Sequence, residues 1–296
     1  MRPYLLGSLT AAALMLMMSA DRASAQGAAP RTAAGCPLAD PVRFHECALP
    51  KTKSFNPPRT PDGKPDLQGT WDRAFTSQDV EEHGADGLNQ QPGPSLVLDT
   101  PDHKIPYQPW ALEFRKGIVA RFISPLASCF TPGVPREAVA PGAHQIVQTP
   151  GYVMHLMESM HSYRVIPTTG EPHVGRAIKL YEGNSRGRWE GNTLVVDVTN
   201  QNGLTWLDNA GNFVSDALHV VERFTMIDAD TIHYEARLED PKVYTRPWTM
   251  VTALMRNRDP KFELWEQACH EGNQAVEGQI RVGLKLFTGV TPPGGK

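Results

Sequence analysis

The fold is decided by residues 218–238, LHVVERFTMIDADTIHYEARL. Two runs rich in Val, Ile, Thr, Tyr and Phe flank the turn residues Asp228-Ala229-Asp230, which is the pattern of two antiparallel strands joined by a tight connection. Similar short runs recur on both sides, and no long helical pattern separates them. The sequence therefore predicts an antiparallel meander rather than βαβ units. We expect strands at residues 144–149, 152–158, 161–167, 178–182, 187–190, 193–199, 218–227, 230–238, 247–256 and 261–267.

A sheet with this many strands has two exposed edges unless it closes on itself. The expected fold class is therefore mainly β, with a lipocalin-like barrel as the first choice and a β-sandwich as the second. Residues 66–296 are expected to form a single β-rich domain with a loop-rich N-terminal region, in which residues 109–122, PWALEFRKGIVARF, predict one helix. Repeated prolines in residues 26–65 predict an extended arm.

The N-terminus has the features of a cleavable secretory signal over residues 1–25. Arg2 precedes an apolar stretch at residues 4–18, and the small residues Ala23-Ser24-Ala25 follow, the order typical of such signals. The apolar stretch is shorter than the roughly 20 residues that span a bilayer. We therefore expect a periplasmic or secreted protein without a membrane span after cleavage, with an uncleaved anchor as the alternative.

The charge balance says little about a macromolecular partner. The chain has 29 Lys and Arg and 32 Asp and Glu, and removal of Arg2, Arg22 and Asp21 with the signal leaves a net charge of about −4. Because neither sign is clustered, the sequence disfavours nucleic acid and anionic membrane surfaces as partners. We expect a small-molecule ligand or substrate, and the sequence does not indicate an oligomeric state.

Four cysteines lie in the mature chain. An even number in an oxidising compartment favours two disulfides. Of the three possible pairings we expect Cys36–Cys47, which closes a local loop, and Cys129–Cys269, which joins distant segments. A metal site built on cysteines is disfavoured because no C-x-x-C spacing is present.

Three predicted strands each place a carboxylate in an otherwise apolar row, because residues two apart in a strand share a face. In residues 218–226 this row contains Leu218, Val220, Glu222, Phe224 and Met226. In residues 152–158 it contains Tyr152, Met154, Leu156 and Glu158. In residues 262–266 it contains Phe262, Leu264 and Glu266.

Buried carboxylates are costly unless they are paired or neutralised. One interpretation is a barrel interior in which Glu222, Glu158 and Glu266 act as general acid and base, with His219 assisting and Arg223 orienting the substrate. A second interpretation is a structural ion-pair network with arginines such as Arg223, Arg164 and Arg237. A third is that a bulge shifts the register and moves these side chains to the other face.

Further residues are candidates for substrate binding. Cys269-His270-Glu271-Gly272-Asn273 follows the last predicted strand. A disulfide at Cys269 would hold His270, Glu271 and Asn273 at a barrel rim, although a plain polar turn explains the same residues. Trp189 and Trp248 could line a pocket for a flat or apolar ligand, or simply belong to the core.

Two other kinds of site are disfavoured. The letters GNSRG at 183–187 match G-x-S-x-G, but they lack the strand-turn-helix context of a serine hydrolase nucleophile. His155, Glu158 and His161 are close in sequence, yet no H-E-x-x-H or H-x-H spacing is present. We therefore expect no metal and no cofactor.

The stretch 183–197, GNSRGRWEGNTLVVD, resembles the hallmark of a family of exported bacterial proteins, most of them of unassigned function. Four further stretches carry the resemblance across most of residues 57–275, namely PDLQGTW at 65–71, LHVVERF at 218–224, Asp240-Pro241 with Pro247-Trp248-Thr249, and CHEGN at 269–273. The resemblance implies export and a single domain. It implies no activity, cofactor or catalytic residue.

Three functional hypotheses follow. The first is an exported, cofactor-independent lyase or isomerase, or a hydrolase, that uses general acid–base carboxylates on a small, largely apolar substrate. The second is a non-catalytic periplasmic binding protein for a hydrophobic ligand. The third is an interaction protein that uses the arm at residues 26–65.

Overall fold

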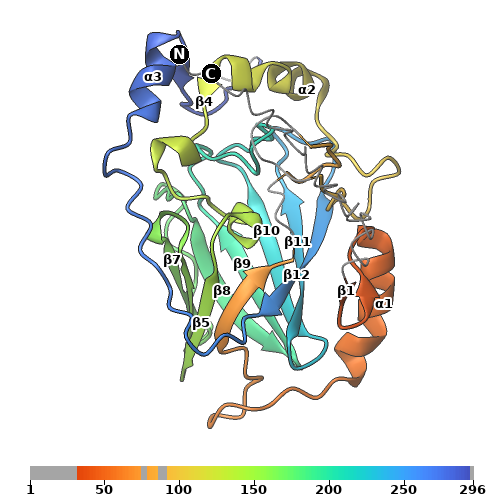
Figure 1. Cartoon of the computed structure of the whole chain (residues 1–296). Helices are drawn as coiled ribbons and strands as arrows, with labels where there is room; N and C mark the ends of the chain where they lie inside the picture. The colour runs from red at the N-terminus through yellow and green to blue at the C-terminus, as the bar shows by residue number, and fades with distance from the viewer. Residues whose placement is uncertain (1–31, 75–78, 86–91, 294–296) are drawn as a thin grey trace, which may run out of the picture.

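The computed structural model describes residues 32–74, 79–85 and 92–293 and is mainly β (Figure 1). Nine antiparallel strands form one sheet that nearly closes into a barrel. In sheet order they are β7 (Tyr163–Pro167), β6 (Tyr152–Met157), β5 (His144–Thr149), β3 (Gly69–Arg73), β12 (Trp248–Arg256), β11 (Thr231–Glu239), β10 (His219–Met226), β9 (Thr193–Thr199) and β8 (Asn184–Glu190). The expected fold class is confirmed.

The sheet consists of two meanders joined by β3. Strands β5 to β7 form one meander and β8 to β12 the other, and β3 pairs with both β5 and β12. The sheet order ends at β7 and β8, and no backbone pairing joins these two strands. They nevertheless lie close together, because a β-carbon on Gly187 of β8 would come about 3.0 Å from Ile166 of β7. Glycine at this position therefore permits the two edges of the sheet to approach.

Helices and short ladders surround the barrel. The helices are α1 (Pro41–Ser54), α2 (Pro109–Arg115) and α3 (Ala275–Arg281), with 3-10 turns η1 (Ile118–Ala120), η2 (Leu126–Ser128), η3 (Arg136–Val139) and η4 (Ser159–His161). Two short ladders pair β1 (Thr32–Ala33) with β2 (Cys36–Pro37) and β4 (Phe122–Ile123) with β13 (Lys285–Leu286). In Figure 1, α1 lies beside the sheet, whereas α2 and α3 lie at one end of the barrel.

Two predicted strands are wrong. Residues 178–182 contain only an isolated bridge from Leu180 to Gln201, and residues 261–267 form no strand. The second segment has apolar alternation but no neighbouring strand to pair with, and it leaves Trp265 75% exposed. Conversely, the sequence does not predict β3, because Gly69–Arg73 is short and follows a proline-rich stretch.

The predicted extended arm is wrong at residues 41–54, which form α1. Asp40 caps this helix by accepting hydrogen bonds from the backbone N–H groups of Val42 and Arg43. Pro41 occupies the first turn, where the helix forms no hydrogen bond to a backbone N–H, so the missing N–H of proline costs nothing. The predicted helix at residues 109–122 is shorter than expected. It ends at Arg115, because Gly117 takes a left-handed conformation with φ of 70° before η1 begins.

Both predicted disulfides are confirmed. Cys36 is bonded to Cys47, and Cys129 is bonded to Cys269. No helix in the described part of the chain is long and apolar enough to cross a bilayer. The signal predicted at residues 1–25 lies outside the described residues.

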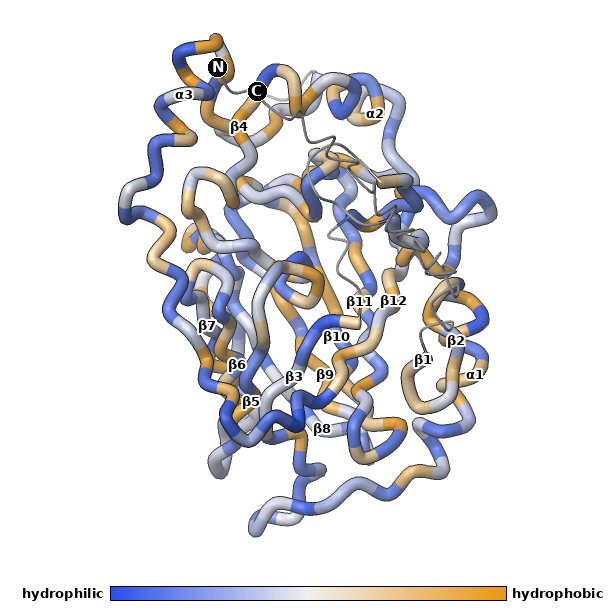
Figure 2. The backbone as a smooth tube through the Cα atoms, viewed as in Figure 1, coloured by the Kyte–Doolittle hydropathy of each residue, from blue (hydrophilic) through white to orange (hydrophobic). Residues whose placement is uncertain are grey.

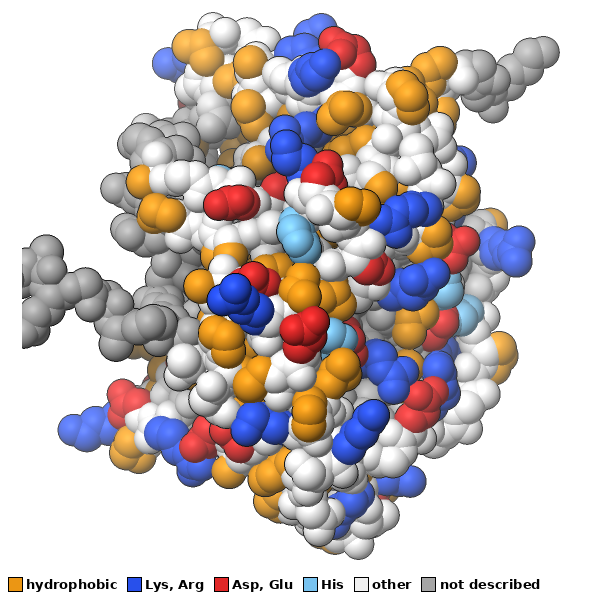
Figure 3. Space-filling model, turned by 90° about the vertical axis from the view of Figure 1, so that its right-hand side faces the viewer, with side chains coloured by type: hydrophobic (Ala, Val, Ile, Leu, Met, Phe, Trp, Pro, Cys, Tyr) orange, Lys and Arg blue, Asp and Glu red, His pale blue; other side chains and the backbone are white. Residues whose placement is uncertain are grey.

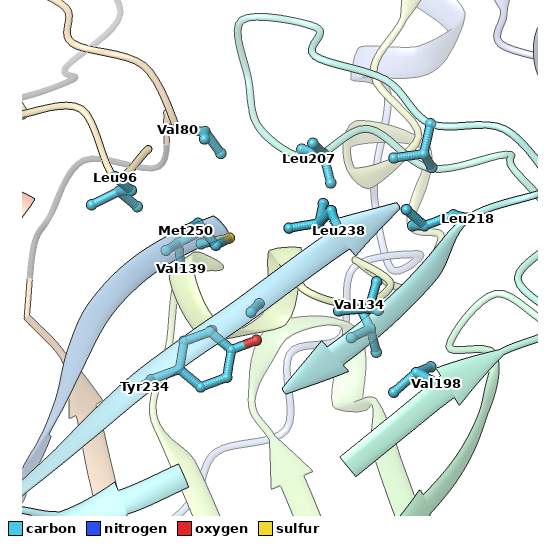
Figure 4. Close-up of a cluster of buried hydrophobic side chains, with 14 of the residues drawn as sticks. Val80, Leu96, Val134, Val139, Val198, Leu207, Leu218, Tyr234, Leu238 and Met250 are labelled. Carbon is cyan, nitrogen blue, oxygen red and sulfur yellow. The ribbon is translucent and has the colours of Figure 1, made fainter. Parts of the chain in front are cut away.

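The main core lies on the inner face of the sheet and under the segments that cover its end. Apolar and polar residues alternate along the strands (Figure 2), as expected for a sheet with one buried face. Tyr234 and Leu238 of β11 and Met250 of β12 pack with Val134, which precedes η3, and with Val139, the last residue of η3 (Figure 4). Segments from outside the sheet therefore fill part of the barrel interior.

Candidate functional site

Glu222 lies in the barrel interior, as its place in the apolar row of β10 predicts. The neighbouring row members Val220 and Phe224 are buried, and Glu222 itself is 0% exposed. Arg164 of β7 donates to both carboxylate oxygens, with Nη1–Oε2 at 2.7 Å and Nη2–Oε1 at 3.2 Å. The Tyr234 hydroxyl donates to Oε1 at 2.9 Å. Both oxygens of Glu222 are thus engaged by fixed partners.

A second carboxylate reaches the same guanidinium from η3. Glu137 is 0% exposed, and its Oε1 contacts Nη2 of Arg164. Nδ1 of His155 on β6 lies 3.4 Å from the same oxygen. Nε2 of His155 in turn lies 3.1 Å from Nδ1 of His144 on β5. The interior therefore contains one connected polar cluster, which we call the interior cluster: His144, His155, Glu137, Arg164, Glu222 and Tyr234.

Arg164 also links the two edges of the sheet. Its Nη1 donates to the Ser185 hydroxyl at 3.2 Å, which places a side-chain hydrogen bond between β7 and β8. Burial alone would lower the pKa of Arg164, but the nearby carboxylates of Glu137 and Glu222 outweigh burial and raise it. The guanidinium therefore remains charged in the barrel interior.

Burial sets the protonation of the remaining cluster members. It raises the pKa of Glu137 to about 8; the Arg164 charge opposes this rise and the Glu222 carboxylate adds to it. Burial and, secondarily, the Arg164 charge lower the pKa of His155 to about 3, and burial also lowers that of His144. Near pH 7 Glu137 is therefore a neutral acid and both imidazoles are uncharged.

Several buried atoms of the interior cluster form no hydrogen bond with any described residue. They are both carboxylate oxygens of Glu137, Nδ1 of His155, Nε2 of His144 and Nε of Arg164. Buried polar atoms are almost always hydrogen-bonded to protein or water. Of these atoms, Glu137 Oε1 and His155 Nδ1 already take part in the ion-pair contacts described above. Glu137 Oε2, His144 Nε2 and Arg164 Nε are the cluster atoms that can hydrogen-bond a further polar group.

Glu158 and Glu266 do not lie in the predicted apolar rows. In β6 the buried face carries Val153, His155 and Met157, the opposite face from the one predicted. Glu158 follows the strand half-buried and accepts hydrogen bonds from the backbone N–H groups of Ala143 at 2.8 Å and Trp265 at 2.9 Å. Glu266 is exposed in a segment that forms no strand. These two predicted positions are wrong.

His219 and Arg223 lie on the outer face of β10, away from Glu222. Nε2 of His219 is 3.0 Å from Asp197 Oδ2, and Nε2 of His173 is 2.8 Å from Asp197 Oδ1. The hydrogen bond that His219 donates to the Asp197 carboxylate is the main cause of a raised pKa of His219. Arg223 instead pairs with Glu190 at 3.1 Å. Alternation along β10 explains why neither side chain reaches the interior cluster.

His173 and His219 border an outer pocket of about 590 Å³. Its wall also contains the cationic side chains of Arg176 and Lys179. The Lys179 ammonium donates to the backbone carbonyl of Asp216 at 2.6 Å. This pocket is open to solvent and is separate from the interior cluster.

The remaining predicted binding residues do not line the interior cluster. Trp248 is a fully buried core residue that packs edge-to-face on Tyr244, and Trp189 is partly buried against the core. His270 and Glu271 are exposed. The side chain of Asn273 donates to the Ala127 carbonyl at 3.2 Å, beside the Cys129–Cys269 disulfide. The predicted cluster after Cys269 is therefore a surface turn.

Sequence reasoning missed Glu137, His144 and His155 as interior residues. A signal for Glu137 exists, since Arg136-Glu137 is a charged pair inside the otherwise apolar run VPREAVA at 134–140. Both side chains are buried. His155 lies on the face of β6 opposite the predicted apolar row. Assigning the buried face of β6 to Val153, His155 and Met157 would therefore have identified His155 as an interior residue.

Comparisons with known proteins identify no relative. No family model matches the chain, and no curated protein matches it. Among solved structures, it is similar to a point mutant of the REP1-NXSQ fatty acid transporter, at 10% identity over 65% of this chain and 98% of that chain, with a TM-score of 0.28. A TM-score this low establishes neither a shared fold nor a shared function, and we infer neither from it.

Proposed function

We propose that this protein is an exported, cofactor-independent acid–base enzyme, a lyase or isomerase, that acts on a small, largely apolar molecule in the barrel interior. The observation that carries the proposal is the pair formed by Glu137 and His155. A carboxyl group whose pKa is about 8 lies 3.4 Å from an uncharged imidazole. A proton donor and a proton acceptor close together in a buried site are what general acid–base catalysis requires.

In this proposal the members of the interior cluster have different roles. Glu137 donates the proton from Oε2, which hydrogen-bonds no described residue. His155 accepts a proton at Nδ1, which lies 3.4 Å from Oε1 of Glu137. The Arg164 guanidinium stabilises negative charge that develops on the substrate. Glu222 and Tyr234 are positioning residues that hold Arg164, because both oxygens of Glu222 are already occupied.

The surroundings of the interior cluster favour an apolar substrate. The buried side chains around it are mostly aliphatic and aromatic, including Val139, Ile146, Val153 and Phe224. Small-molecule sites typically combine an apolar wall with a few convergent polar groups. In a site with an apolar wall, the polar side chains of the interior cluster would orient the substrate and carry out the proton transfers.

Solvent deuterium provides a direct test of this activity. The protein is incubated in D₂O with a collection of small hydroxylated and carbonyl compounds, and mass spectrometry records both product formation and deuterium incorporation. We expect Glu137→Gln to lower turnover of a responding compound by about 10²- to 10⁴-fold, the usual contribution of one acid–base group. Glu190→Gln on the surface of β8 is the matched control. If Glu137→Gln retains turnover within threefold of the wild type, the proposal is wrong.

The second candidate function is a binding protein for an apolar ligand. The largely apolar core around a single polar cluster favours it, since the interior cluster could then recognise one polar group of a ligand without reacting with it. In this case the ligand is released unchanged and contains no solvent deuterium. The same incubation therefore distinguishes the two functions.

We also propose that the protein functions in the periplasm or outside the cell. The Cys36–Cys47 and Cys129–Cys269 disulfides support this location, because disulfides persist in oxidising compartments. Fractionation of cells that express the full chain tests it. Recovery of the protein in the cytoplasm with residues 1–25 still attached would contradict both export and cleavage.

A further inference from the structure

Helix α1 lies on the outer face of the barrel wall. Phe44 and Ala48 of the helix are buried against Val251 and Ala253 of β12, and the Cys36–Cys47 disulfide ties the helix to the β1–β2 ladder. Residues two apart on β11 share a face. His233 and Glu235 therefore point to the same side of the sheet, where His45 of α1 approaches them.

These three side chains bring their ligand atoms together. Nδ1 of His45 lies 3.3 Å from Nε2 of His233 and 3.4 Å from Oε1 of Glu235. One ligand atom from each residue lies within 4.8 Å of the others. One N–H on Nδ1 of His45 can donate a hydrogen bond to His233 or to Glu235, but not to both at once. A cation between the three ligand atoms could be bound by all three together.

The spacing fits a tetrahedral transition-metal ion. Zinc is bound by imidazole nitrogen at about 2.0–2.1 Å, and the corresponding edge of a tetrahedron is about 3.3–3.4 Å. Two ligand-to-ligand distances in this group have that length. We propose that His45, His233 and Glu235 form a binding site for one Zn²⁺ ion, which fastens α1 to the barrel wall.

The surroundings of the site support this assignment. The His233 side chain is 1% exposed, whereas His45 and Glu235 are 18% and 20% exposed. The site is therefore anchored in the wall and reachable from solvent on one side. Figure 3 views the molecule from the side on which α1 lies in Figure 1 and shows acidic and basic side chains interspersed there.

Two imidazoles and one carboxylate would leave one tetrahedral position for water. Arg223, which lies opposite Glu235 on β10, is paired with Glu190 at 3.1 Å. Its charge is thus offset by another carboxylate. No sequence spacing reveals this site, because His45 and His233 are 188 positions apart.

Zinc and cobalt binding to the full mature chain tests the site. Protein stripped with a chelator is titrated with Zn²⁺ in a calorimeter and with Co²⁺ in a spectrophotometer, where tetrahedral Co²⁺ absorbs in the visible range. We expect one equivalent of each ion. His45→Gln and Glu235→Gln each remove a direct ligand, so their affinity should fall by more than the roughly 10- to 100-fold that loss of an outer-shell partner costs. His270→Gln, an exposed histidine elsewhere, should bind zinc as the wild type does.

Two results would overturn this inference. The first is less than about 0.1 equivalent of zinc bound by the wild type at micromolar concentration, where an intact zinc site is filled. The second is binding that remains unchanged in both His45→Gln and Glu235→Gln, which would place the ion elsewhere. Because the metal-free variants can be compared by circular dichroism, a loss of folding is distinguished from a loss of ligands. Deuterium incorporation by the interior cluster is a separate measurement, so the two proposals fail independently.

Discussion

Replacement of Arg164 by Met should destabilise the protein strongly, because Arg164 is the cation that the buried side chains of Glu137 and Glu222 both contact. The substitution removes both hydrogen bonds to Glu222 and the bond to Ser185 while largely keeping the side-chain volume. Glu137 can remain protonated, so the uncompensated charge is that of Glu222. Breaking a buried ion pair from one side costs about 3–5 kcal/mol, and we expect a loss of about 4 kcal/mol.

Urea unfolding with the disulfides intact measures this loss as a lower midpoint at constant slope. The matched control is Arg188→Met on β8, where an exposed arginine pairs with exposed Glu190, an arrangement that contributes less than about 1 kcal/mol. Adding Glu222→Gln to Arg164→Met should restore much of the stability, since it removes the unpaired charge. The reasoning is refuted if Arg164→Met costs no more than Arg188→Met, or if the double variant is as unstable as Arg164→Met.

Three further predictions concern other parts of the molecule. The folded-state pKa of Glu137 is raised to about 8 from an ordinary 4.5. Its contribution to stability is therefore complete below about pH 4.5 and lost as pH rises to about 8. Glu137→Gln should gain stability relative to the wild type over this range, as measured by urea unfolding at each pH. Asp197→Asn should lower the pKa of His219, measured by NMR titration, because the Asp197 hydrogen bond is the main cause that raises it. Loss of the Cys129–Cys269 disulfide, which closes a loop with a sequence separation of 140, should cost about 5 kcal/mol in the chain-entropy model, measured by thermal and urea unfolding.

Each of these predictions has a control within the chain. A constant stability difference between Glu137→Gln and the wild type from about pH 4.5 to 8 would contradict the protonation of Glu137. Asp216→Asn should leave the titration of His219 unchanged, because Asp216 pairs with Lys242. Loss of Cys36–Cys47, whose separation is 11, should cost about 3 kcal/mol, and an equal cost for the two disulfides would contradict the loop-length argument.

The sequence predicted the second meander well because its strands pair with their neighbours along the chain. Alternation places Glu222 correctly among buried residues, since β10 runs without a bulge between β9 and β11. The same reasoning failed at residues 261–267, where alternating apolar residues have no adjacent strand. Alternation of apolar and polar residues indicates which face of a strand is buried once the strand is part of a sheet. It does not show whether neighbouring strands are present to pair with it.

The interior cluster was only partly predictable for a different reason. Arg164 and Glu222 lie on strands, so periodicity gives information about them. Glu137 comes from a 3-10 turn in a loop-rich region, and no local pattern shows that this turn enters the barrel. The same limit hid the pairing of His45 with β11, because helix α1 reaches the wall only through tertiary packing.

The central position of β3 constrains how the barrel can assemble. This strand lies early in the chain, yet its neighbours β5 and β12 come from the middle and near the end. A chain that emerges N-terminus first cannot complete the sheet until residue 256 is free, because β12 ends there. The second meander, whose contacts are local, can form before that point, but the two halves join late. If the protein is exported as an unfolded chain, in line with the location proposed above, this order of events keeps the barrel open until translocation is nearly finished.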